Sequence, residues 1–170
     1  MNVVFYISAG IAIVATFMVI TRLNAVHALI YLIISLLALA VVFYTLGAPF
    51  AAALEIIIYA GAIMVLFVFV VMMLNLGPAS LDLEKSWLHP KMWLGPSMLA
   101  AVLLAELIYM IGRAPSSAGG RIVGTRQLGL ALFGPYLLGV ELASMLLLAG
   151  LVGAYHLGLR PPALPQRKGD

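Results

Sequence analysis

The chain has 170 residues, of which 65% are hydrophobic and 9% are charged. Soluble globular domains are about 25% charged, so nine Lys+Arg and six Asp+Glu cannot cover a water-facing surface of this size. The composition excludes a soluble enzyme domain, a disordered protein and a nucleic-acid binder, and the absence of cysteine excludes disulfides and thiolate metal sites.

Five apolar runs with few or no charges follow one another along the chain. A bilayer core about 30 Å thick is crossed by about 20 helical residues, so each run predicts one transmembrane helix. The predicted helices are, in chain order, 3–21, 26–46, 50–76, 92–112 and 132–157. We therefore expect an all-α polytopic membrane protein, with a single transmembrane domain over 1–157 and a cytoplasmic tail over 158–170.

The basic residues between the helices predict how the chain is oriented, because cytoplasmic connections carry an excess of Lys and Arg. The connections on the side of the C-terminus hold six basic residues, and those on the side of the N-terminus hold three. This difference favours an N-terminus outside and a C-terminus in the cytoplasm.

Three carboxylates lie inside the apolar runs, at Glu55, Glu106 and Glu141. A charged side chain costs several kcal/mol to bury in a bilayer, so an intramembrane carboxylate is a candidate for proton transfer. The alternative is that each carboxylate caps a helix near the interface or hydrogen-bonds a neighbouring helix. For Glu106 the two interpretations are evenly balanced.

Two further residues of the predicted third helix accompany its carboxylate. Tyr59 follows Glu55 by four residues, on the same helix face, and either relays a proton or packs between helices. Gly61 costs about 1 kcal/mol against alanine inside a helix. It permits close helix packing or a π-bulge, whose conversion to α-helix would rotate the following residues, including Met64 and Val65, by roughly 100°. The residues alone favour static packing for both positions.

Three stretches of the chain resemble subunit J of bacterial NADH-quinone oxidoreductase, the respiratory complex I, whose mitochondrial relative is chain 6. They read NAVHALIYLIISLL over 24–37, ALEIIIYAGAIMVLFVFVVMMLN over 53–75 and ELASMLLLAG over 141–150. The resemblance covers residues 1–76 and 135–158, and the second stretch is its most specific part.

The resemblance implies a switch in the third helix. Subunits of this family hold a π-bulge at the Tyr-Ala-Gly stretch, and its conversion to α-helix is linked to a hydrated proton path that couples quinone reduction to pumping. This role maps onto Tyr59, Gly61 and Val65, with Glu55 as the nearby proton-path carboxylate. The secondary candidates are Met64, Glu141 and Glu106, and the last of these matches no position carried over from the family.

The resemblance also implies a setting. The chain is expected to be a subunit of an enzyme, a proton-translocating NADH:quinone oxidoreductase, in the bacterial inner membrane. It would bind no cofactor itself, because FMN, iron–sulfur clusters, NADH and quinone are expected on other subunits. Its expected partners are the lipid bilayer and membrane subunits of types A, H, K and N, with no nucleic acid.

Two alternatives remain open on the sequence. The chain could be a structural or assembly subunit of the same complex, with its carboxylates serving helix packing. It could instead be a small secondary transporter that uses Glu55 or Glu141, although it lacks the internal repeats that such folds often show.

Overall fold

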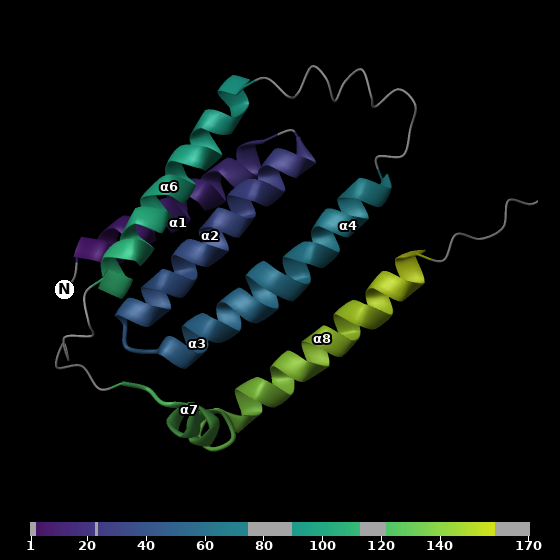
Figure 1. Ribbon diagram of the computed structural model, residues 1–170. Helices are drawn as coiled ribbons and strands as arrows, with labels where there is room; N and C mark the ends of the chain where they lie inside the picture. The colour runs from purple at the N-terminus through teal and green to yellow at the C-terminus, as the bar shows by residue number, and fades with distance from the viewer. Residues whose placement is uncertain (1–2, 23, 75–89, 113–121, 159–170) are drawn as a thin grey trace, which may run out of the picture. The chain divides into compact units, whose positions relative to one another are not determined.

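The computed structural model describes residues 3–22, 24–74, 90–112 and 122–158, and every regular element in these ranges is helical (Figure 1). Five helices are long and apolar enough to cross a membrane. Their bounds are Val3–Thr21, Ala25–Thr45, Pro49–Met73, Trp93–Gly112 and Leu137–Gly158. The prediction of an all-α chain with five such helices is confirmed.

The described helices fall into two compact units, Met1–Gly124 and Thr125–Asp170. The first unit contains the first four membrane-spanning helices. Its elements are α1 (Val3–Thr21), α2 (Ala25–Thr45), α3 (Pro49–Leu54), η1 (Glu55–Ile63), α4 (Met64–Leu74) and α6 (Pro90–Gly112).

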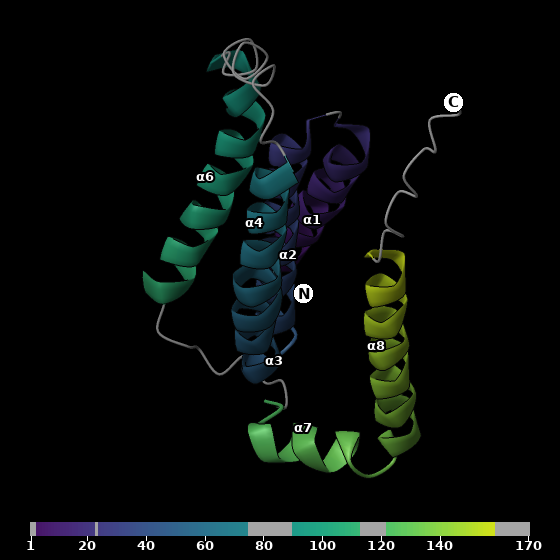
Figure 2. The same cartoon turned by 90° about the vertical axis from the view of Figure 1, so that its right-hand side faces the viewer.

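Helix α2 is the centre of the first unit, because it contacts α1, α6 and all three segments of the third span (Figures 1 and 2). A small apolar cluster fixes α1, α2 and α6 together, and two of its members are alanines with fully buried side chains, which let the helices approach closely. The cluster consists of Ile11, Ala15, Ile34, Ala38 and Leu103.

Short connections hold the first three spans in sequence. Asn24 caps α2, because its Oδ1 accepts hydrogen bonds from the backbone N–H groups of Val26 at 2.9 Å and His27 at 3.2 Å. Gly47 turns the chain after α2 with a φ of 83°, a conformation that side chains disfavour. The Gly47 carbonyl accepts a hydrogen bond from the Val123 N–H at 2.8 Å, which ties the end of the first unit to this turn.

The second unit contains α7 (Thr125–Leu132) and α8 (Leu137–Gly158), with α7 lying across the direction of α8 (Figure 2). The fifth span therefore begins at Leu137 rather than at the predicted Leu132. Pro135 lacks an N–H group and disfavours helical geometry at the residue before it, which separates the two helices. The predicted tail lies outside the described residues, apart from Gly158 at the end of α8.

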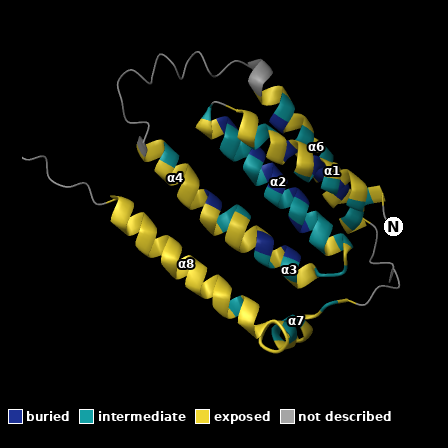
Figure 3. Cartoon of the chain, turned by 180° about the vertical axis from the view of Figure 1, so that it is seen from behind, coloured by how far each residue is buried: buried dark blue, intermediate teal, exposed yellow. Residues whose placement is uncertain are grey.

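Most side chains of the membrane-spanning helices are not buried within the chain (Figure 3). Helix α8 contains no buried residue, and the exposed side chains of η1 and α4 are almost all apolar. Apolar faces of this extent are suited to lipid or to the helices of neighbouring proteins.

Candidate functional site

The third span changes its winding in the middle. It begins as α-helix in α3, continues as the nine-residue π-helix η1, and returns to α-helix in α4. The N–H of Met64 marks the change, because it points to the carbonyl of Tyr59, five residues earlier, as well as to that of Gly61. Long π-helices are rare and π winding is frequent at functional sites, so this segment is the first candidate for a site.

Gly61 lies inside the π-helix, at a position where a side chain would be crowded. A Cβ atom added at Gly61 would lie 3.2 Å from the carbonyl oxygen of Ile56, five residues earlier and therefore one π turn away. This spacing is tighter than an ordinary van der Waals contact. The glycine therefore removes a close contact that a side chain would make in the π form.

Glu55 and Tyr59 face different surroundings. The Glu55 side chain is only 8% exposed, at the start of η1 where this helix packs on α2. The Tyr59 side chain is 49% exposed. Among the described residues these two side chains do not hydrogen-bond each other, so any proton transfer between them needs a bridging water.

Met64 and Val65 are neighbours with opposite environments. Met64 is 2% exposed and is one of the largest fully buried side chains among the described residues, whereas Val65 is 67% exposed. The junction between η1 and α4 therefore fixes which residue of the span points inward.

Glu106 lies on α6 and meets α1 instead of the third span. Its Oε2 accepts a hydrogen bond of 2.7 Å from the Ser8 hydroxyl, and the two side chains are 8% and 0% exposed. Sequence reasoning missed Ser8, since a lone serine in an apolar helix gives no hint of a partner 98 residues away. The predicted hydrogen bond to a neighbouring helix is present at this carboxylate.

Glu141 belongs to the second unit and is exposed on α8. Its backbone carbonyl accepts a hydrogen bond of 2.7 Å from the Ser144 hydroxyl, within the same helix. The three carboxylates thus have distinct environments: Glu55 at η1, Glu106 in the α1–α6 contact, and Glu141 on the surface of α8.

The imidazole of His27 makes no hydrogen bond, since neither ring nitrogen has a partner among the described residues. The side chain is 5% exposed and its ring lies edge-on to Trp93, with 5.9 Å between the centroids. The ring is covered where α6 packs on α2, and no pattern in the sequence predicts this contact.

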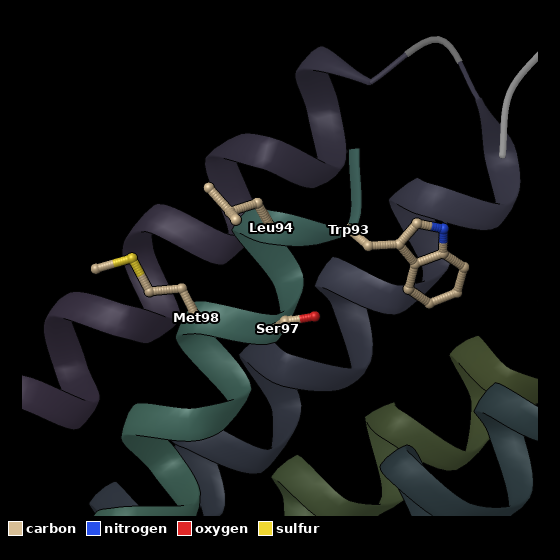
Figure 4. Close-up of a pocket in the computed structure, with 4 residues that line it drawn as sticks. All are labelled: Trp93, Leu94, Ser97 and Met98. Atoms are coloured by element: carbon tan, nitrogen blue, oxygen red, sulfur yellow. The ribbon is translucent and has the colours of Figure 1, made fainter. Parts of the chain in front are cut away.

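A hollow of about 520 Å³ lies on α6, away from the residues above (Figure 4). Its lining residues are Trp93, Leu94, Ser97 and Met98. Leu94 and Met98 point to one side of the helix and Trp93 to the other, so the hollow is a shallow surface between side chains (Figure 4). None of the predicted site residues lines it.

Comparison with known proteins agrees with this architecture. Residues 15–157 match the family model for NADH-ubiquinone/plastoquinone oxidoreductase chain 6. The chain is 64% identical over 160 residues to the NADH-quinone oxidoreductase subunit J of Pseudomonas aeruginosa, with 93% of this chain and 96% of the relative covered. It is 56% identical to the subunit J of Escherichia coli K12 over 174 residues, covering 100% and 95% of the two chains.

The helices define the class of the protein, which is a polytopic helical membrane protein with π winding in its third span. Because the family model covers most of the chain and the relatives align almost end to end, the chain belongs to the NADH-ubiquinone/plastoquinone oxidoreductase chain 6 family, which includes the J subunits of NADH-quinone oxidoreductase.

Proposed function

We propose that the chain is a non-redox membrane subunit of a proton-translocating NADH:quinone oxidoreductase, and that η1 is the switch that couples quinone reduction to proton pumping. Family membership supports the assignment to the complex. The observation that carries the coupling role is the π-helix over Glu55–Ile63, with Gly61 at the point where a side chain would press on the turn before it.

The switch follows from helix geometry. If η1 loses one residue from its winding, α4 rotates by roughly 100° relative to α3, because each residue of an α-helix turns by that angle. A rotation of this size brings a neighbour of Met64 to the inward position that Met64 now fills, and Val65, at 67% exposed, is the more exposed of its two neighbours. Exchange of a long thioether for a shorter branched side chain would open room for water beside α2.

The polar residues of the span would then use that water. Glu55 is buried at the start of η1, which packs on α2, and its carboxyl can hold or release a proton. The Tyr59 phenol, one turn along, can order a water between them. Glu141 and Glu106 are secondary proton-path candidates on other helices.

This role also implies where the chain lies, how it is oriented and what it contacts. The chain would lie in the bacterial inner membrane with its N-terminus outside and its C-terminus in the cytoplasm. Its exposed apolar faces would contact lipid and membrane subunits of types A, H, K and N. FMN, iron–sulfur clusters, NADH and quinone would be bound by other subunits, and no electron carrier by this chain.

The test replaces Gly61 by leucine in the intact complex and uses Gly10→Leu as the matched control. Gly10 is also a helical glycine of the first unit, but nothing lies within 4 Å of an added Cβ there. We expect Gly61→Leu complexes to assemble, and their NADH:quinone reductase activity and proton pumping to fall together. Gly10→Leu complexes keep both. Wild-type pumping by Gly61→Leu membranes would disprove the switch.

A structural role is the second candidate, and the Ser8–Glu106 hydrogen bond favours it, because a carboxylate that joins two helices serves packing. It predicts that variants of the carboxylates weaken assembly while the complex that does form keeps its normal proton stoichiometry. For Glu55 the coupling role predicts that variants assemble normally and that their proton pumping falls.

A further inference from the structure

The contact between Ser8 and Glu106 closes one end of the apolar cluster of the first unit. Ser8 lies one turn before Ile11 on α1, and Glu106 lies one turn after Leu103 on α6. Since Ile11 and Leu103 belong to the same cluster, α1 and α6 run antiparallel at this level and place the hydroxyl and the carboxyl together. The pair is therefore surrounded by the packing of two helices.

The carboxyl of Glu106 receives too little compensation for a full negative charge. Oε2 has the Ser8 hydroxyl as a donor at 2.7 Å, but Oε1 is buried and has no hydrogen-bond partner in the part of the chain that the structure describes. An ionised carboxyl has two acceptor oxygens with about four lone-pair sites. Burial of a charge without a paired cation is far more costly than burial of a neutral polar group.

Positive charges on the described parts of the neighbouring helices are too distant to help. Arg22 is 14 residues beyond Ser8, about 21 Å along α1, and its guanidinium lies over the Tyr31 ring. His27 packs on Trp93, which is 13 residues before Glu106, about 20 Å along α6. Helix α6 also contains Lys91, which is 15 residues before Glu106, about 22 Å along the helix. The remaining titratable groups of α1 and α6 are the phenols of Tyr6 and Tyr109, and a phenol carries no positive charge in either protonation state.

We propose that Glu106 and Ser8 form a proton-binding site between α1 and α6. The carboxyl holds a proton on Oε1 and uses Oε2 as the carbonyl oxygen that accepts the Ser8 hydrogen bond. Because Oε1 is buried, release of the proton requires the packing around this oxygen to open. The site develops the secondary proton-path role given to Glu106 above by naming the oxygen that holds the proton. It is separate from the switch in η1, since it exists whether or not η1 changes its winding.

The test is infrared difference spectroscopy on the intact complex at neutral pH, comparing wild type with Glu106→Gln. A protonated carboxyl absorbs as an acid carbonyl, whereas an ionised one absorbs as a carboxylate at lower frequency. We expect Glu106→Gln to remove one acid-carbonyl band, which shifts in D2O when it exchanges. Glu55→Gln leaves that band in place. If Glu106→Gln instead removes a carboxylate band and leaves the acid-carbonyl bands unchanged, the proposal is overturned.

The Ser8→Ala variant keeps the proposal testable if Glu106→Gln fails to assemble. Removal of the hydroxyl takes the donor from the carbonyl oxygen, so the acid band should move to higher frequency without losing intensity. An unchanged acid region in Ser8→Ala would show that the hydroxyl does not bond a neutral carboxyl. This outcome is independent of pumping by Gly61→Leu membranes, so failure of the proton site and failure of the switch are distinguishable.

Discussion

Gly95 of α6 lies directly against the hydroxyl of Tyr31 on α2, so closely that a Cβ atom at Gly95 would collide with the Tyr31 Oη. Tyr31 is 3% exposed and carries the Arg22 guanidinium 5.4 Å from its ring centroid. The contact brings α6 onto the central helix and also brings Trp93 to the ring of His27.

This contact predicts a rescue experiment. Gly95→Ala should destabilise the α2–α6 packing by about 1–3 kcal/mol, the usual cost of overpacking, and lower the temperature at which the complex loses this chain. Tyr31→Phe removes the oxygen that the new methyl group meets, so the double variant should recover much of the loss. Gly112→Ala, where nothing lies within 4 Å of the added atom, is the control. Additive effects of the two substitutions would contradict the contact.

A graded effect is expected at Gly61. Gly61→Ala adds only the Cβ atom that would lie 3.2 Å from the Ile56 carbonyl. A strain of about 1 kcal/mol in the π form alone would shift the balance toward α-helix about fivefold. Coupled quinone reduction and pumping should therefore fall less in this variant than in Gly61→Leu. The measurement is NADH-driven proton uptake by inverted membrane vesicles, and equal activity of Gly61→Ala and wild type would show that this contact does not control the winding.

Replacement of Glu55 by glutamine should slow pumping modestly and leave assembly intact. Glutamine keeps the shape of the buried side chain but cannot exchange a proton. Water and other carboxylates can share the proton path, so we expect a fall of less than about tenfold, equivalent to about 1.4 kcal/mol in the barrier. Native gel electrophoresis and proton uptake measure the two properties separately. Loss of the complex with normal pumping by the remainder would indicate a packing role for Glu55.

The α1–α2 contact depends on a pair of hydroxyl groups. The Thr16 and Ser35 hydroxyls lie 2.7 Å apart, and the Ser35 hydroxyl also donates to the Ala12 carbonyl at 3.1 Å. Thr16→Val should weaken the pairing of these helices by about 0.6 kcal/mol, the mean value for hydrogen bonds between membrane helices.

The matched control for this pair is Thr21→Val, because the Thr21 hydroxyl donates only to carbonyls of its own helix, at Phe17 and Met18. Heat-induced release of the chain from the complex should begin at a lower temperature for Thr16→Val than for Thr21→Val. Identical release curves would mean that the pair of hydroxyls contributes nothing to the association of α1 with α2.

The spans could be predicted from the sequence because continuous apolar runs of this length have few other stable forms. The start of the fifth span was harder, since the run reads through Gly134 and Pro135 without a charge, and the break arises from backbone geometry. The π winding is a subtler case. Glycine inside a helix is compatible both with a π-bulge and with close helix packing, so Gly61 alone did not distinguish the two. The expectation of π winding came from the family resemblance.

The contacts of Glu106 and His27 could not be predicted, because they depend on which helices become neighbours. Ser8 is 98 residues from its partner, and nothing in the local pattern of α1 or α6 specifies that pairing. The burial of His27 depends in the same way on the close approach of α6 to α2 at Gly95. Pairings between distant helices follow from packing as a whole, whereas spans follow from local composition.

The absence of buried side chains in α8 has a consequence for how fast unassembled copies of the chain are degraded. Within the described part of the chain, the apolar side chains of α8 are left without cover, so this helix depends on lipid and on neighbouring subunits to shield it. Copies made in excess of the other subunits should therefore be removed rapidly by membrane proteases, so that the amount of this chain tracks the amount of finished enzyme.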